Sequence, residues 1–209
     1  MNNQERPVER KRAFGQNYTK SVPDMVGIWL SGYRVRRWIP SFKGKAIGDF
    51  GCGYAATFVR SIAADARALT LVDVTLADDL KSDPKVTAIE GFLPAALHSI
   101  PAESLDVVLC INVLEHLWDP GLVLQEIRRV LTPTGACFLN VPSWTGKVLL
   151  ETLAFRLNMT PKEEIDDHKT YYSPRDLWRL VVGSGFKPSQ VVCRPHKLGL
   201  NTFAVCKKG

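Results

Sequence analysis

The fold of this chain is decided by the stretch from Ala46 to Val59, which reads Ala-Ile-Gly-Asp-Phe-Gly-Cys-Gly-Tyr-Ala-Ala-Thr-Phe-Val. Its first residues have the apolar density of a buried parallel strand, and residues 55–64 have helix-forming composition. Between them, Gly51 and Gly53 permit a sharp turn and leave no side chain between backbone and ligand. Unpaired N–H groups at the helix start favour polar ligand atoms. The stretch therefore predicts a strand, a turn and a helix that cradle a nucleotide-sized ligand.

The glycine spacing by itself fits a dinucleotide-binding site. Gly51, Gly53 and Ala56 satisfy Gly-x-Gly-x-x-Gly/Ala, and Asp73 lies about 20 residues further on, where a ribose-binding acid is expected. Asp49 argues against this interpretation, because a dinucleotide-binding strand normally has an apolar side chain there. An acid at a buried strand tip costs free energy unless it faces a ligand or a partner.

At this point the chain resembles the class I S-adenosylmethionine-dependent methyltransferases, whose first motif is acid-x-Gly-x-Gly-x-Gly. Asp49 stands for the acid, Gly51 and Gly53 for the first two glycines. Ala55 replaces the third glycine. The resemblance implies that the cofactor S-adenosylmethionine is bound by this loop, which comprises Asp49, Phe50, Gly51, Cys52 and Gly53.

Two further strand ends extend the predicted cofactor site. Residues 68–73 form a strand that ends in Asp73, followed by Val74. The resemblance implies that Asp73 binds both ribose hydroxyls, and carboxylate oxygens can accept two such donors; the alternative is an Asp that caps the next turn. After a third strand, residues 86–89, the family often has Gly-Asp, whereas this chain has Gly91-Phe92. Phe92 either stacks on adenine or belongs to the core.

The most family-specific stretch follows the apolar strand Leu105 to Ile111 and reads Asn-Val-Leu-Glu-His, residues 112–116. It resembles the motif after the fourth strand of class I methyltransferases. The resemblance implies that Asn112 lies beside the cofactor and that Glu115 and His116 border the active site. The alternative for His116 is a turn histidine that hydrogen-bonds the backbone.

Strands and helices alternate through five rounds, which predicts a parallel sheet with helices on both faces. Pro133 and Gly135 are expected to end the fourth helix, and residues 136–141 are predicted as the fifth strand. The last two strands, residues 190–193 and 202–206, predict an antiparallel hairpin. We therefore expect an α/β fold with a doubly wound, mostly parallel seven-stranded sheet. Residues 1–43 are assigned to an N-terminal arm and cap helix, and residues 44–209 to the methyltransferase domain.

Residues 143–167 break the alternation. They combine an apolar segment with an acidic run, which suggests a lid or wall of the substrate pocket. A homodimer contact through residues 143–160 and a helix on a membrane surface are the alternatives. The lid is followed by His168 and then by a capping box at Ser173 and Asp176, which predicts a helix start.

The composition of the chain indicates its domain organisation, its redox state and its expected location. The chain has 209 residues, is 45% hydrophobic and carries a net charge of +6, which suits one globular domain. The basic N-terminal arm is either a solvated tail or a contact for anionic partners; it contains Arg6, Arg10, Lys11 and Arg12. Five cysteines without paired spacing indicate reduced core residues. With no signal-peptide core and no span of ~20 apolar residues, the sequence predicts a cytoplasmic protein without a membrane span.

The predicted reaction is methyl transfer to an oxygen, nitrogen or carbon of a small molecule, sugar or lipid. The Asn-Pro-Pro-aromatic motif of many nucleic-acid methyltransferases is absent after the fourth strand, so a nucleic-acid acceptor is not favoured. If a proton must leave the acceptor, His168, ahead of His116, is the expected base. No Cys/His cluster has metal-ligand spacing, so no metal is expected. An NAD(P)-dependent oxidoreductase and a non-catalytic cofactor-binding module remain the alternatives.

Overall fold

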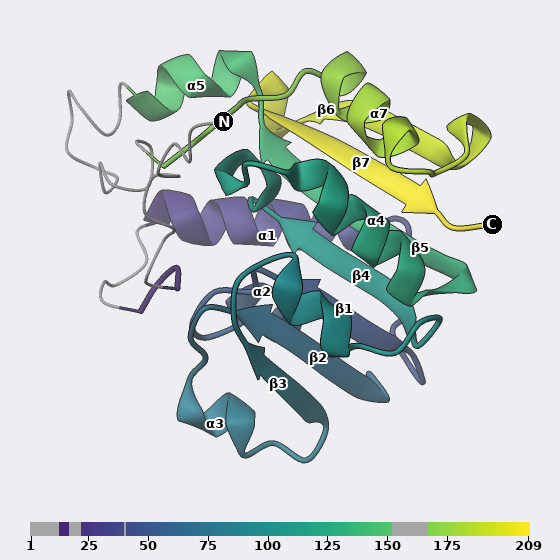
Figure 1. The fold of residues 1–209 in the computed structure, drawn as a ribbon. Helices are drawn as coiled ribbons and strands as arrows, with labels where there is room; N and C mark the ends of the chain where they lie inside the picture. The colour runs from purple at the N-terminus through teal and green to yellow at the C-terminus, as the bar shows by residue number, and fades with distance from the viewer. Residues whose placement is uncertain (1–12, 17–21, 40, 152–166) are drawn as a thin grey trace, which may run out of the picture.

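The computed structural model describes residues 13–16, 22–39, 41–151 and 167–209 and contains one seven-stranded sheet (Figure 1). The strand order is β3-β2-β1-β4-β5-β7-β6. All neighbours pair in parallel except β5 with β7 and β7 with β6. The strands are β1 (Ala46–Phe50), β2 (Ala68–Asp73), β3 (Val86–Glu90), β4 (Leu105–Ile111), β5 (Leu131–Pro142), β6 (Val191–His196) and β7 (Asn201–Lys207). The predicted fold class is thus confirmed.

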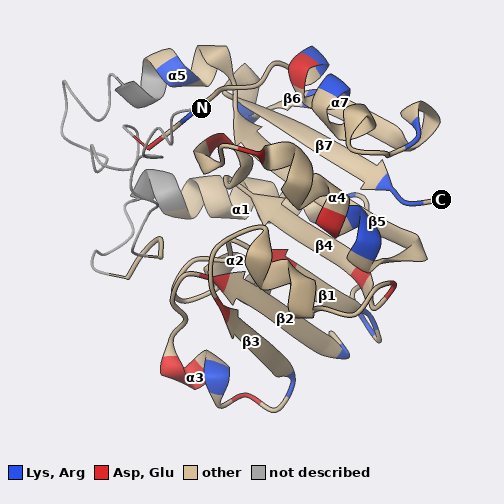
Figure 2. Cartoon of the chain, in the orientation of Figure 1, with Lys and Arg blue, Asp and Glu red and all other residues tan. Residues whose placement is uncertain are grey.

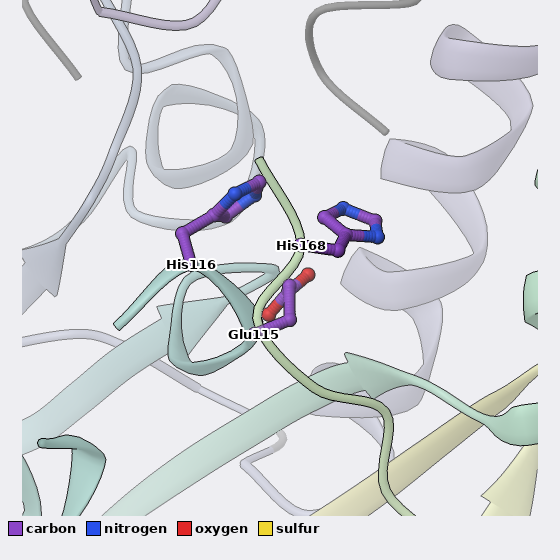
Figure 3. Close-up of side chains that lie close together, drawn as sticks. All are labelled: Glu115, His116 and His168. Atoms are coloured by element: carbon purple, nitrogen blue, oxygen red, sulfur yellow. The ribbon is translucent and has the colours of Figure 1, made fainter. Parts of the chain in front are cut away.

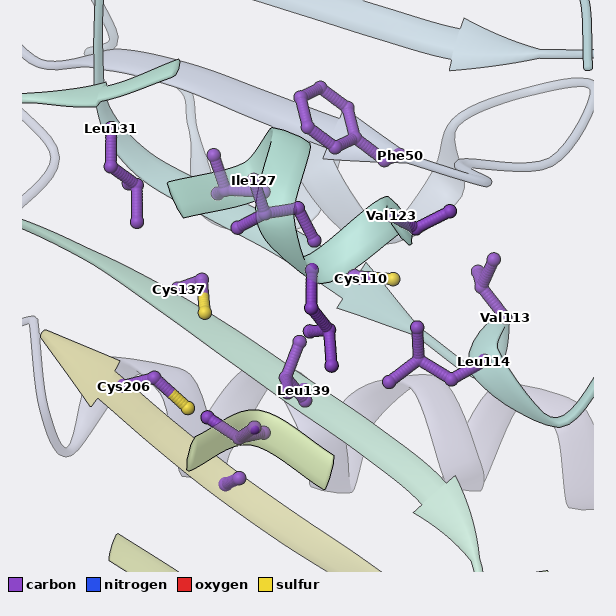
Figure 4. Packing of buried hydrophobic residues seen from close by; sticks show 14 of the residues in the cluster. Phe50, Cys110, Val113, Leu114, Val123, Ile127, Leu131, Cys137, Leu139 and Cys206 are labelled. Carbon is purple, nitrogen blue, oxygen red and sulfur yellow. The ribbon is translucent and has the colours of Figure 1, made fainter. Parts of the chain in front are cut away.

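Helices cover both faces of the sheet (Figure 1). The described helices are α1 (Val22–Arg36), α2 (Thr57–Ile62), α3 (Asp78–Lys81), α4 (Pro120–Val130), α5 (Trp144–Glu151) and α7 (Pro174–Gly183). The short 3₁₀ turns are η1 (Ala95–Ser99), η2 (Leu114–His116), η4 (Pro188–Gln190) and η5 (Lys197–Gly199). One apolar cluster joins the sheet to α4 and α7, and Figure 4 shows part of it. A second cluster joins the sheet to α1, α2 and α3.

Most element boundaries follow the sequence expectation. Strand β4 has the predicted bounds, and α7 begins with the predicted capping box, in which Ser173 Oγ accepts from the backbone N–H of Asp176. Strand β5 starts at Leu131, five residues before its expected start at Ala136. The reason is that Leu131 already pairs with Leu105 before an irregularity in the ladder, so Pro133 and Gly135 lie within the strand and not in a loop.

Charged residues avoid the interior of the sheet, whose strands are coloured as uncharged over most of their length in Figure 2. The predicted basic arm and residues 152–166 of the predicted lid lie outside the described residues. Over the part of the chain described, no helix combines the length and apolar character needed to cross a membrane.

Candidate cofactor and acceptor site

The turn after β1 has the two glycines where the backbone requires them. Gly51 and Gly53 have φ values of +75° and +74°, a region that side chains disfavour. A Cβ on Gly51 would lie 2.3 Å from Val113 Cγ2, and one on Gly53 would lie 3.1 Å from the carbonyl oxygen of Phe14. Any side chain at Gly51 would therefore clash with Val113, which packs directly against the turn.

Asp49 ends β1 as a buried acid with 2% of its surface exposed. Among the described residues, its Oδ2 atom has no hydrogen-bond partner. Burial, and then the charge of Asp73, raise the pKa of Asp49 to about 8. A buried carboxyl that lacks a partner fits a ligand with positive charge or N–H donors, and S-adenosylmethionine carries both.

Asp73 ends β2 and holds the glycine turn. Its Oδ2 accepts from the backbone N–H of Gly53 at 2.8 Å, and its Oδ1 accepts from that of Val74 at 2.7 Å. Each carboxylate oxygen can accept a second bond, so capping and ribose binding are compatible.

A cavity of about 220 Å³ lies beside this turn. Among the predicted cofactor residues, its lining includes Gly51, Asp73, Val74, Phe92 and Asn112. Phe92 is 42% exposed, so it belongs to the cavity wall and not to the core. Four predicted cofactor residues do not line the cavity: Asp49, Phe50, Cys52 and Gly53. Phe50 packs into the core cluster, and burial, together with Asp49 and Asp73, raises the pKa of the Cys52 thiol.

Asn112 is held in an unusual conformation at the tip of β4. Its φ of 57° lies in the left-handed region, which Asn tolerates better than most residues. Its N–H donates to the carbonyl of Asn140 at 2.7 Å, and Asn140 Nδ2 donates to Asn112 Oδ1 at 2.7 Å. These bonds turn the chain from β4 into η2, which carries Glu115 and His116.

The two predicted base candidates come together with a buried acid (Figure 3). One ligand atom from each of Glu115, His116 and His168 lies within 4.8 Å of the others, which is close enough to share a metal ion. Glu115 is 1% exposed, and the rings of His116 and His168 have centroids 4.7 Å apart. Spacing along the sequence could not indicate this cluster, because its members come from segments about 50 residues apart.

His116 lines the cavity, and an acid that the sequence analysis missed orients its ring. His116 Nδ1 lies 3.0 Å from Asp167 Oδ2, and Lys169 Nζ lies 2.6 Å from Asp167 Oδ1. Burial would raise the pKa of Asp167, but hydrogen bonds from His116 and Lys169 outweigh it and lower the pKa to about 2. His168 instead directs Nδ1 toward the hydroxyl of Tyr171 at 3.1 Å and is not part of the cavity lining.

Backbone bonds fix the segment that carries these groups. The N–H of Lys169 donates to Glu115 O at 2.7 Å, and the N–H of Tyr172 donates to Pro142 O at 3.1 Å. Thr202 Oγ1 donates to Tyr172 O at 2.7 Å. The segment is thus joined to η2, β5 and β7 together.

Comparison with known proteins indicates the family of this chain. A family model described as a methyltransferase domain matches residues 48–139. A ubiquinone biosynthesis O-methyltransferase of Vibrio cholerae is 28% identical over 147 residues, covering 66% of this chain and 59% of that protein. A probable S-adenosylmethionine-dependent methyltransferase of Mycolicibacterium smegmatis is 32% identical over 162 residues, covering 75% of this chain and 58% of that protein.

Solved structures share the fold. A SAM-dependent methyltransferase from Archaeoglobus fulgidus superposes with a TM-score of 0.62 at 19% identity, covering 87% of this chain and 94% of that one. The CurJ carbon methyltransferase gives 0.60 at 16% identity, covering 85% and 52%. At these identities the likeness concerns the fold alone.

The family model, the fold and the glycine turn support a class I S-adenosylmethionine-dependent methyltransferase, as the sequence predicted. S-adenosylmethionine is accordingly its cofactor. The chain spans less than two thirds of the length of the first relatives it matches, 59% and 47% in two of them.

Proposed function

We propose that this protein transfers the methyl group of S-adenosylmethionine to a hydroxyl oxygen of a small molecule, and that His116 accepts the hydroxyl proton. The observation that carries the proposal is the His116–Asp167 pair at the edge of the cavity, with 3.0 Å between Nδ1 and Oδ2. The names of the O-methyltransferase relatives support oxygen as the methylated atom. The fold does not select the atom, because a carbon methyltransferase shares it.

The cofactor would be held by the glycine turn and the strand tips. Gly51 gives space for its amino-acid part, Asp49 offers a buried acceptor, and Asp73 binds the ribose. Phe92 and Trp118, both exposed on the cavity wall, supply aromatic faces for adenine. When bound, the cofactor supplies a methyl group already activated by the positive charge on sulfur. The protein's main contribution is then alignment, which removes about 7 to 11 kcal/mol of barrier in well-oriented reactions.

His116 acts as the base through the nitrogen that Asp167 leaves exposed. With Nδ1–H donating to Asp167, the lone pair resides on Nε2, which can accept the hydroxyl proton. Asp167 then stabilises the imidazolium, and Lys169 holds Asp167 in place. This geometry favours His116 over His168, the reverse of the preference drawn from the sequence.

The acceptor is a small molecule, with sugars and lipid precursors included. The rings of Trp144 and Tyr171 have centroids 5.6 Å apart, and the Tyr171 ring also contacts His168. The two rings would form an apolar wall for the acceptor. Residues 143–167 remain our candidate lid, and residues 143–160 a candidate homodimer contact. Neither an oxidoreductase nor a non-catalytic module is supported by the comparisons.

The proposal is tested by substitution of the two histidines with an exposed histidine as control. His116→Ala should lower the maximal methylation rate by about 10²- to 10⁴-fold, the usual contribution of a positioned base. Cofactor affinity should stay near its original value. His98→Ala, on exposed η1, should behave as wild type. Full activity in a His116→Ala, His168→Ala double variant would remove histidine from the mechanism.

A chelator separates a base from a metal at the same cluster. We propose that no metal takes part, so turnover should survive chelation. The opposite outcome is that chelation abolishes turnover and that added zinc restores it in the wild type but not in His116→Ala. An ion held on Glu115, His116 and His168 would then take the place of the base in the mechanism.

A further inference from the structure

Three basic side chains gather between α1 and the β6–β7 hairpin. The guanidinium carbon of Arg34 lies 5.7 Å from the ring centroid of Phe203, and the His196 ring centroid lies 5.6 Å from the same ring. Lys197 Nζ would lie 3.5 Å from a Cβ on Gly27. Gly27 and Arg34 are seven positions apart, so they lie on the same face of α1.

Arg34 and Lys197 bring positive charge to this cluster, and Glu115 is an acid whose charge acts on Lys197. Over the described ranges, Arg34 Nε and His196 Nε2 are buried without hydrogen-bond partners, and Lys197 Nζ makes no ion pair. Burial lowers the pKa of Lys197 to about 8, opposed by the charge of Glu115. Burial, with Lys197 and Arg34, lowers the pKa of His196 to about 4. An incoming anion would compensate these costs.

The backbone is strained in the way that directs Lys197 inward. Lys197 and Leu198 have φ values of 50° and 58°, both in the left-handed region. The Leu198 side chain is fully exposed at 102%, whereas Lys197 is partly buried beside α1. An exposed leucine side chain and a partly buried lysine side chain are both energetically unfavourable. Unfavourable local arrangements of this kind are concentrated at ligand sites.

The cluster lies next to the proposed reaction centre. The charge of Glu115 raises the pKa of Lys197, and the Glu115 carboxylate also lies within 4.8 Å of the ring nitrogens of His116 and His168. Ser143, at the start of the candidate lid, donates to Gly199 O at 2.6 Å, so η5 is also joined to that end of the sheet. Lys197 does not line the cavity beside His116, so an acceptor would have Lys197 in its surroundings only where it extends from His116 past Glu115 toward η5.

We propose that Lys197, with Arg34 and His196 beside it, binds an acid group of the methyl acceptor. The acceptor is then a hydroxyl compound that also carries a carboxylate or a phosphate. This inference rests on the proposed function, because it takes the anion to be part of the molecule that is methylated. Lys197 sets specificity and takes no part in the proton transfer.

The test is calorimetric titration of the protein saturated with S-adenosylhomocysteine. The probes are 3,4-dihydroxybenzoate, its uncharged methyl ester and inorganic phosphate. The benzoate or phosphate should bind wild type, and Lys197→Met should weaken binding by about 10- to 100-fold, as expected for loss of a charged hydrogen bond. The exposed-lysine control Lys187→Met should bind as wild type. Comparison of the two acids tells carboxylate from phosphate.

Two further measurements keep the result unambiguous. Lys197→Met should melt at the wild-type temperature or above, because it removes a buried charge, and Lys197→Arg should retain acid binding. Equal affinity for the benzoate and its ester, equal affinity in wild type and Lys197→Met, or no binding of either acid would overturn the inference. Failure of the proposed function is distinguishable, because it would leave S-adenosylhomocysteine binding absent or methyl transfer independent of His116.

Discussion

The cofactor half and the acceptor half of the site are built in different ways. The cofactor half uses Asp49, Gly51 and Asp73, which end neighbouring parallel strands or follow them directly. The proposed acceptor half uses His116, Asp167 and Lys197, which come from segments far apart in the sequence; His116 and Asp167 are in direct contact. In the first half the sheet topology positions the ligands, whereas in the second the packing of irregular segments does so. We therefore expect the backbone of the cofactor half to be rigid and the geometry of the acceptor half to depend on how its segments pack.

The largest expected effect concerns Asp73. Asp73→Ala should weaken S-adenosylhomocysteine binding by about 2 to 4 kcal/mol, since charged hydrogen bonds at a partly buried site are lost. Asp73→Asn should also bind weakly but melt closer to wild type, because its amide oxygen can still accept from Gly53 N–H. Calorimetry and thermal melting measure both, with exposed Asp65→Ala as control. Normal binding combined with a collapsed melting temperature would leave Asp73 only a structural role.

The second effect concerns acid stability in the acceptor half. The folded-state pKa of Asp167 is about 2, below the ordinary 3.8, so its contribution is present above pH 4 and is lost as the pH falls toward 2. Its side chain is only 22% exposed. Asp167→Asn should lower the free energy of unfolding at pH 7 by about 2 kcal/mol, and the difference should narrow below pH 4. Urea denaturation at pH 7 and pH 3 checks this; a constant difference would contradict it.

The third effect is a pH dependence of cofactor binding. With the pKa of Asp49 raised from 3.8 to about 8, the carboxyl is mostly protonated at pH 7 in the free protein. A cationic cofactor prefers the ionised form, so affinity should rise by up to about tenfold per pH unit as the pH approaches 8. Asp49→Asn should remove this slope. Because the pKa of Asp49 is higher in the folded protein than in the unfolded chain, the free protein becomes less stable as the pH rises from 4 to 8. A flat wild-type affinity profile would contradict the assignment.

The smallest effect is a difference in amide protection. Trp144 and Val148 on α5 are 55% and 67% exposed, whereas β4 is almost completely buried between neighbouring strands. Hydrogen exchange should be faster for the amides of α5 than for those of β4. Saturation with S-adenosylhomocysteine should protect the turn at Gly51 more than α5. Equal strong protection of α5 and β4 would make the start of the candidate lid a fixed structural element.

The sequence was sufficient for the sheet and for most of the cofactor half. Strand β4 is a nearly continuous apolar run, so both of its ends could be predicted. Gly51 and Gly53 predicted a sharp turn, and both have positive φ values. Phe50 shows the limit of this approach: a residue within a motif can direct its side chain into the core. Strand β5 was expected too short because Pro133 and Gly135 indicated the end of the preceding helix, yet the register irregularity near Leu105 accommodates them in the strand.

The acceptor half could be predicted only in part. His116 and His168 were candidates from their residue type, but their proximity depends on the segment 167–172, which no local pattern joins to η2. Asp167 was hidden in an acidic run that suggested a solvated loop. Phe14, which lines the cavity and whose carbonyl accepts from Tyr54 N–H at 2.9 Å, lay in a stretch without periodicity. The sequence around Lys197 did not indicate its burial, because this burial depends on the left-handed backbone conformation of Lys197 and Leu198.

The two backbone bonds of segment 167–172, together with the bond from the Thr202 side chain, impose a constraint on chain length. Lys169 is paired with η2, and Tyr172 with β5 and β7, so the two residues between them span a fixed distance. One residue inserted or deleted there would break one of these bonds, and loss of the Lys169 bond to Glu115 would release Asp167 from its place beside His116. Substitutions on α5 or in η5 leave that distance unchanged. During divergence, acceptor preference can therefore change through α5 and η5, while the length of this short connection is kept.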